Sequence, residues 1–256
     1  MNRNIKLIIA YDGTEFHGWQ RQEGSRTVQG EIENALFKMH GHHVGVNGSG
    51  RTDSGVHAKG QAANFITDID SIPPDRFSPA LNSLLAHDVR ILESREEDIN
   101  FHARFSAKSR LYRYQFLCRT SADSGSSFLP YEARYNFRLR RYPSLELLNS
   151  YGRLLLGETD CTIFADSGDN AVTEGRSKNR YIYSCYFYIE KETLVFEIRA
   201  NAFLRKMVRS AAGTFLHYEE SETPPFKLRE IIASGDRSLA GPTLPPCGLF
   251  LWNVEY

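Results

Sequence analysis

The spacing of apolar and polar residues along the chain predicts a mixture of strands and helices. Apolar runs and period-two alternation bounded by turn residues are typical of strands, and apolar residues three or four apart are typical of helices. The predicted strands are 5–11, 43–46, 61–67, 88–92, 108–118, 180–189, 194–199 and 248–256, and the predicted helices are 28–39, 74–85, 145–156 and 204–217. Because several strands follow one another through short loops, the pattern favours an α+β fold with antiparallel sheet over a doubly wound parallel fold.

Two local signals refine this picture. Thr27 stands directly before the first predicted helix, where its hydroxyl can cap the free backbone N–H groups. The segment 93–98 carries four carboxylates and resembles an exposed boundary. We therefore predict two domains, at 1–105 and 106–256.

Composition narrows the class of protein. Of 256 residues, 41% are hydrophobic and 24% are charged, which is ordinary for a soluble globular protein. No apolar run approaches the ~20 residues of a membrane span, and the N-terminus lacks the pattern of a signal peptide. The four cysteines contain no C-x-x-C pair, so we expect neither a zinc site nor a disulfide framework, and we expect a reducing, cytoplasmic location.

The glycine-rich stretch 48–58 surrounds Asp53 and has several interpretations. The simplest is a turn in which the aspartate caps its own backbone. A phosphate loop is a second one, since 45–52 matches G-x-x-x-x-G-K-[ST] with Arg51 in place of lysine, but that motif needs a following helix. An aspartic protease is a third, because Asp53-Ser-Gly recurs as Asp166-Ser-Gly, although the cation of Arg51 would hold the carboxylate ionised.

A fourth interpretation rests on resemblance. Five segments, in order, are YDGTEFHGWQ (11–20), GRTDSGVHA (50–58), FHARFSAKSRLYRY (101–114), NAFLRKMVR (201–209) and AGPTLPPCGLFL (240–251). Each closely resembles a motif of the TruA family of tRNA pseudouridine synthases, and together they cover the chain from residue 11 to residue 251. The resemblance implies two similar α+β halves with a central, mainly antiparallel sheet and a catalytic cleft between them. It also implies an isomerase that needs no cofactor or metal, and a homodimer that binds the anticodon arm of tRNA.

The resemblance assigns roles to four residues. Asp53 matches the carboxylate that the family uses as nucleophile or general base on a uridine at tRNA position 38, 39 or 40. Arg209 matches its cationic partner, and Tyr112 matches the tyrosine that packs on the target base. Since a stacked uridine must be flipped out before reaction, Arg51 is suited to fill the vacated stack or hold a flanking phosphate.

Some neighbouring residues have no assigned role. Ser54 replaces the alanine usual in the family, Tyr114 is expected to serve packing, and His57 and Lys59 fit solvated or loop-bracing roles equally well. The rival from another class is a catalytically silent RNA-binding module of the same fold. The presence of Asp53, Tyr112 and Arg209 argues against it.

The charge balance first argues against a nucleic-acid partner, since 31 Lys and Arg stand against 31 Asp and Glu. The distribution is uneven, however. The windows 101–122, 133–145, 175–189 and 198–218 hold 71 residues with 16 Lys and Arg and no Asp or Glu. They include Tyr112 and Arg209, so cations and aromatic rings interleave as they do in RNA contact surfaces. The sequence therefore predicts a neutral protein with a basic face.

Overall fold

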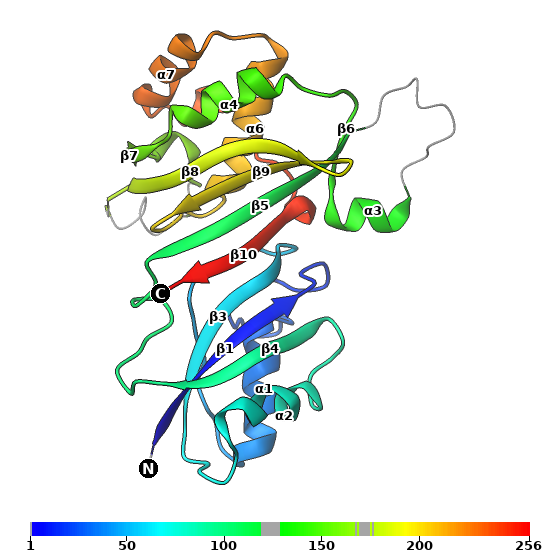
Figure 1. Cartoon of the computed structure of the whole chain (residues 1–256), viewed down its shortest axis with the longest axis vertical. Helices are drawn as coiled ribbons and strands as arrows, with labels where there is room; N and C mark the ends of the chain where they lie inside the picture. Colours follow the sequence, from blue (N-terminus) through cyan, green and yellow to red (C-terminus); the bar gives the residue numbers. More distant parts are fainter. Residues whose placement is uncertain (1, 119–128, 167, 169–174, 176) are drawn as a thin grey trace. The chain divides into compact units, whose positions relative to one another are not determined.

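The computed structural model describes residues 2–118, 129–166, 168, 175 and 177–256 (Figure 1). The chain forms two compact units. The first consists of Met1–Lys108 together with Phe250–Tyr256, and the second of Ser109–Leu249. The last strand of the chain thus returns to the unit in which the chain begins.

The first unit consists of mainly antiparallel strands with helices packed against them (Figure 1). Its elements are β1 (Arg3–Tyr11), α1 (Val28–His40), β2 (Asn47–Gly48), β3 (His57–Thr67), a 3₁₀ turn at Pro74–Arg76, α2 (Phe77–Asn82), β4 (Val89–Glu97) and β10 (Leu249–Glu255). Strand β1 pairs antiparallel with both β3 and β4, β2 pairs antiparallel with β3, and β10 runs parallel to β3.

The second unit repeats this combination of strands and helices, with α4, α6 and α7 packed beside its strands (Figure 1). Its elements are β5 (Ser109–Cys118), α3 (Pro130–Tyr135), β6 (Phe137–Leu139), α4 (Leu145–Arg153), β7 (Gly157–Asp160), β8 (Asn179–Glu190), β9 (Thr193–Ala200), α6 (Met207–Glu220) and α7 (Pro225–Ser234), with 3₁₀ turns at Thr162–Phe164, Arg237–Leu239 and Pro246–Gly248. Strands β5, β9, β8 and β7 are antiparallel neighbours in that order, and β6 runs parallel to β5. The prediction of an α+β fold with mainly antiparallel sheet is confirmed.

The helix α1 forms for the reasons expected. Thr27 accepts a hydrogen bond from the Gly30 N–H, and Gly41 ends the helix in the left-handed conformation. The apolar side chains that recur at helical spacing, such as Ile32 and Leu36, are fully buried. Its capped N-terminus thus lies shortly after the first motif, which ends at residue 20.

The predicted strand at 43–46 is wrong. Val44 and Val46 are buried, as in a strand, but the Val46 N–H donates to the Glu33 carboxylate (3.1 Å) rather than to a neighbouring strand. A side chain of α1 thus replaces the strand partner, and the short strand β2 follows at Asn47–Gly48.

The acidic segment is not a boundary, because β4 continues through it to Glu97. Two of its carboxylates form ion pairs with cations on the neighbouring strand β1. Glu96 pairs with Arg3 (2.9 Å) and Glu97 with Lys6 (3.6 Å). Acidic residues on one strand and basic residues on the next therefore support the sheet edge.

The helix predicted at 74–85 is shorter and begins as a 3₁₀ turn. Pro79 has no N–H to donate to the Asp75 carbonyl, so it is tolerated only in the first turn of an α-helix, and it is the third residue of α2. Helix α2 then ends at Asn82, whose side chain bonds the backbone of Ile91 on β4 (2.8 Å in both directions).

Candidate active site

Asp53 lies on an irregular loop between β2 and β3. Its side chain is of intermediate exposure, and its carbonyl accepts a hydrogen bond from the Val56 N–H (3.2 Å). The preceding Thr52 is buried, with its hydroxyl 2.8 Å from the hydroxyl of Tyr11 on β1. Arg51 lies on the same loop and is exposed. The loop thus carries a carboxylate and a guanidinium near solvent and is anchored between them.

Residues of the first motif (11–20) form hydrogen bonds with the backbone of this loop. The Trp19 N–H donates to the Thr52 carbonyl (3.1 Å), and the Gly55 N–H donates to the Phe16 carbonyl (3.2 Å). Gly18 has a φ of 88°, and a Cβ there would lie 2.6 Å from the Thr52 carbonyl oxygen. Only glycine satisfies both conditions. The backbone on each side of Asp53 is therefore fixed by the chain segment 11–19.

Sequence reasoning identified the motifs at 11–20 and 50–58 but not that one holds the other. These contacts join residues about 40 positions apart, as in the pair of Tyr11 and Thr52. The only hint of this contact in the sequence was that both motifs occur in the same chain. The departure at Ser54 is accommodated there, since its hydroxyl donates to the Phe16 carbonyl (3.2 Å).

Two of the alternative interpretations fail on this geometry. The phosphate-loop hypothesis needs a helix after residue 52, whereas β3 follows at His57–Thr67. The protease hypothesis needs Asp166 to share a proton. Burial opposes ionisation of Asp166, but the hydrogen bond from Lys206 (2.9 Å), the charges of Lys206 and Arg205 and a backbone hydrogen bond from Gly168 together outweigh it and lower the pKa of the carboxyl. Ser167 of that motif lies outside the described residues.

In the second unit, Tyr112 and Tyr114 point to the same side of β5 but differ in their surroundings. Tyr112 is 8% exposed and meets Phe203 edge to face at 4.9 Å between ring centroids. Tyr114 is fully buried, donates to the Pro245 carbonyl (2.7 Å), and has a raised pKa because of its burial. The expectation that Tyr114 serves packing is confirmed.

Arg209 is half-buried on α6. Its Nε donates to the Leu244 carbonyl (2.7 Å), and the Leu244 N–H donates back to the Arg209 carbonyl (3.3 Å). The fourth and fifth motifs are therefore bonded to each other within this unit. The start predicted for the helix at 204–217 is wrong, because α6 begins at Met207 after Lys206, which has a left-handed φ of 59°, so Arg205 lies outside the helix that carries Arg209.

The structure thus brings Arg51 and Asp53 together on one loop of the first unit. Tyr112 and Arg209 belong to the second unit.

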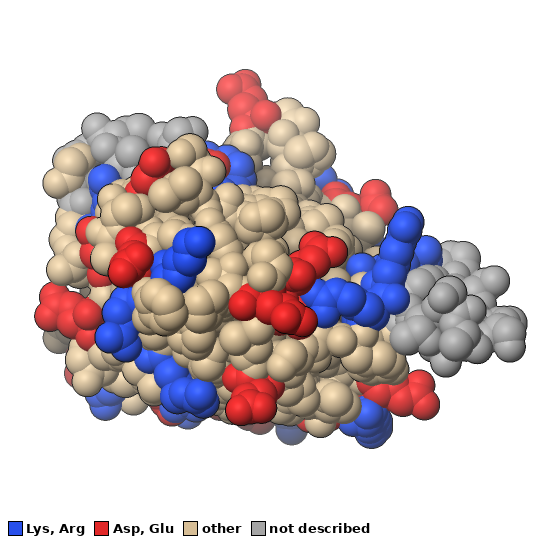
Figure 2. Space-filling view, turned by 90° about the horizontal axis from the view of Figure 1, so that it is seen from above, with Lys and Arg blue, Asp and Glu red and all other residues tan. Residues whose placement is uncertain are grey.

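Several cations of the basic windows are paired with acidic residues that stand just outside them. Arg113 binds Glu197 (2.7 Å), Lys206 binds Asp166, and Arg141 binds Glu219. On the side of the second unit that carries α4 and α7, basic and acidic side chains are interspersed (Figure 2). That side is therefore not the predicted basic face.

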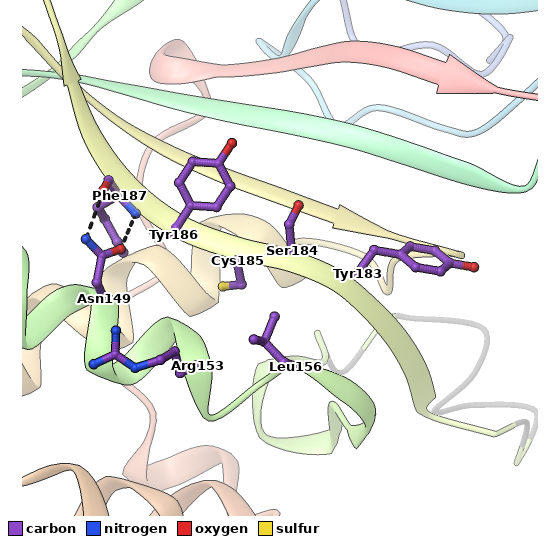
Figure 3. A pocket seen from close by; sticks show the side chains of 8 residues that line it. All are labelled: Asn149, Arg153, Leu156, Tyr183, Ser184, Cys185, Tyr186 and Phe187. Atoms are coloured by element: carbon purple, nitrogen blue, oxygen red, sulfur yellow. Dashed lines mark hydrogen bonds between the residues drawn. The ribbon is translucent and has the colours of Figure 1, made fainter.

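A hollow of about 420 Å³ lies between α4 and β8 (Figure 3). Arg153 and Leu156 line one side of it, and the strand residues Tyr183 to Phe187 line the other. Burial raises the pKa of the Cys185 thiol, and burial together with Glu197 raises the pKa of Tyr186 to about 12. Both groups are protonated and poorly nucleophilic at neutral pH, and none of the predicted site residues lines the hollow.

Among the described residues, no group of three or more His, Cys, Asp or Glu side chains is arranged to hold a metal ion. In the same part of the chain, no helix is long and apolar enough to cross a membrane.

The mainly antiparallel strands, the helices and the hydrogen-bonded loop at 49–56 define an α+β protein whose candidate active site centres on one carboxylate. A family model described as tRNA pseudouridine synthase matches residues 7–106 and 153–256, ranges that contain Arg51, Asp53 and Arg209. The chain therefore belongs to the tRNA pseudouridine synthase family, an isomerase family, as the five motifs indicate.

Curated relatives agree over nearly the full length. The chain is 49% identical over 259 residues to a Treponema denticola protein named tRNA pseudouridine synthase A, covering 99% of this chain and 93% of that one. Proteins of the same name are 47% identical in Treponema pallidum (94% and 84% covered) and 41% identical in Caldicellulosiruptor saccharolyticus (99% and 100% covered). The resemblance to the TruA family is confirmed.

Proposed function

We propose that this protein converts uridine to pseudouridine at positions 38, 39 and 40 of tRNA, with Asp53 as the reacting carboxylate. In this isomerisation the N1–C1′ bond breaks, the base turns over, and a C5–C1′ bond forms. The C5 hydrogen leaves as a proton to solvent and N1 gains one, so the reaction needs no oxidant, energy source or metal.

One observation carries the proposal. Asp53 stands half-exposed on a loop whose neighbouring residues Thr52 and Gly55 are hydrogen-bonded to Trp19 and Phe16 through their backbone atoms. A turn that merely capped itself would not need a second motif to hold it. A carboxylate that must meet a ribose in one orientation does, because catalysis by such a group depends on its placement.

The other residues receive roles in the same reaction. Tyr112 offers a flat ring for the flipped base, and Arg209, fixed through Leu244, offers the guanidinium that the family motif supplies as the cationic partner of the reacting carboxylate. Arg51 occupies the stack that the uridine leaves, or holds the adjacent phosphate. Flipping costs a few kcal/mol, which contacts of this kind offset.

The test is release of tritium from tRNA labelled at C5 of uridine, in EDTA and without ATP. We expect release from a transcript with uridines at positions 38–40 and none from one in which these are cytidines. No release from either transcript would refute the synthase. Equal release from both would refute the choice of positions.

The second candidate function is a silent RNA-binding module, for which the anchored loop would only bind RNA. It predicts tRNA binding by the wild-type protein without tritium release. The same assay therefore separates the two functions.

We also infer a homodimer that acts on tRNA in the cytoplasm, on the basis of the family resemblance. Light scattering coupled to gel filtration should give twice the chain mass of 29.2 kDa. A mass of one chain at micromolar concentration would contradict the dimer.

A further inference from the structure

His57, the first residue of β3, is buried although it stands only four positions after Asp53. It is 1% exposed, and its ring stacks on Phe250 of β10 at 4.7 Å between centroids. A solvated role for His57 is therefore excluded, and a loop-bracing role is left.

The imidazole contacts the turn that follows β1. Its Nδ1 lies 3.0 Å from the Gly13 N–H and 3.2 Å from a carboxylate oxygen of Asp12. An imidazole with its proton on Nε2 accepts from Gly13, and one with a proton on Nδ1 donates to Asp12. In either case the partner of Nδ1 belongs to the same turn.

That turn packs directly against the loop that carries Asp53. A Cβ on Gly13 would lie 2.0 Å from the carbonyl oxygen of Val56, the residue before His57. The turn has a fixed shape of its own, since Asp12 accepts hydrogen bonds from the N–H (3.1 Å) and hydroxyl (2.6 Å) of Thr14. A rigid turn thus meets the loop at the place where β3 begins.

We propose that His57 is a positioning residue for Asp53. Through Nδ1 it fixes the register between the turn at 12–14 and the segment 53–57, and so sets the direction of the Asp53 carboxylate. Trp19 holds the backbone before Asp53, Phe16 holds the backbone after it, and His57 holds the end of the loop. The inference rests on the proposed function, in which Asp53 reacts with the uridine.

Three variants distinguish the hydrogen bond of the His57 Nδ1 atom from the stacking of the His57 ring on Phe250. His57→Asn keeps a polar atom at the position of Nδ1, His57→Gln moves it further from the backbone, and His57→Phe keeps the ring against Phe250 but has no atom for Gly13. The control is Asn82→Ala, which removes two partly buried hydrogen bonds between α2 and Ile91 on β4 in the same unit.

The measurements are single-turnover tritium release at saturating enzyme, tRNA affinity, and melting temperature. A displacement of about 1 Å costs roughly a hundredfold in rate, so we expect His57→Phe and His57→Gln to lose about tenfold or more in rate with tRNA affinity within about twofold. His57→Asn should stay within about threefold of wild type. Asn82→Ala should lower the melting temperature without changing the rate of the folded enzyme.

A structural role alone gives a different result. His57→Phe would then resemble Asn82→Ala, with a lower melting temperature and a wild-type rate, and this would overturn the inference. If His57→Phe does not fold, a wild-type rate in His57→Gln overturns it equally. An inactive wild-type protein, or activity retained in Asp53→Asn, contradicts the proposed function instead, so the two failures can be distinguished.

Discussion

At the scale of single residues, the loop at 49–56 combines a half-exposed carboxylate with backbone that is already hydrogen-bonded. The contacts near Asp53 use main-chain atoms of Thr52 and Gly55. Side-chain substitutions at position 53 therefore leave the anchoring bonds in place, and they test chemistry more than folding.

Asp53→Asn should abolish turnover while leaving tRNA binding within about twofold. The amide has the shape of the carboxylate but is neither a nucleophile nor a base, so we expect a loss of about three orders of magnitude or more in kcat. Tritium release measures the rate, and filter binding measures the affinity. Asp75→Asn, an exposed carboxylate of the same unit, is the matched control and should be unchanged. Full activity in Asp53→Asn would move the reacting group elsewhere.

Arg209→Ala should lower kcat by about a hundredfold, because the positive charge that we propose for the reaction site is lost. The variant also loses the hydrogen bond to the Leu244 carbonyl, so its melting temperature must be measured beside its rate. Arg229→Ala on α7 removes an exposed arginine of the same unit and serves as control. Equal activity in the two variants would make Arg209 a packing residue of α6.

At the scale of elements, the turn after β1 is supported by an ion pair that the sequence did not suggest. Arg26 binds Asp88 through two hydrogen bonds (2.7 and 2.9 Å), and its guanidinium lies 4.2 Å from the Phe16 ring centroid. The Asp88 carbonyl accepts from the Asp12 N–H (3.0 Å). One pair thus ties the start of β4 to the first motif.

Asp88→Asn should destabilise the fold by about 1–2 kcal/mol at neutral pH. The Arg26 guanidinium lowers the pKa of Asp88 below its ordinary value, against the opposing effect of burial. A lowered pKa contributes stability above the unfolded-state pKa, about 3.9, and this contribution is lost as pH falls through the lower folded value. Urea unfolding of both proteins between pH 7 and pH 3 should show the difference shrinking only below about pH 4. A pH-independent difference would assign the effect to packing.

The elements that the sequence predicted well are those with enough residues to show a period. Strands β1, β5, β8 and β9 and helix α1 belong to this group, whereas β2 and β6 have two and three residues and show none. Strand β4 was predicted too short because its outer residues are charged, and only the cations of β1 explain why a strand tolerates them. For the site, Asp53 followed from a motif, but the contacts of His57 and Thr52 depend on which segments the fold brings together.

At the scale of the whole molecule, the net charge of zero is the sum of segments rich in Lys and Arg and segments rich in Asp and Glu. The windows without acidic residues lie mostly in the second unit, and part of their charge is neutralised by Glu197, Glu219 and Asp166. Arg138 on β6 and Arg140 just after it are exposed and are candidates for phosphate contacts. The predicted basic face is therefore smaller than the count of 16 Lys and Arg suggests.

The affinity for tRNA should fall steeply as salt rises, since each phosphate contact releases counterions on binding. The double variant Arg138→Ala with Arg140→Ala should weaken binding and reduce the slope of log affinity against log salt by about 1.5, at about 0.7–0.9 per contact. The control is Lys38→Ala with Arg76→Ala, which removes two exposed cations of the first unit and the same charge. Because net charge changes equally in both proteins, only position distinguishes them. Equal slopes in the two double variants would mean that tRNA responds to the overall charge of the protein and that no basic face exists at Arg138 and Arg140.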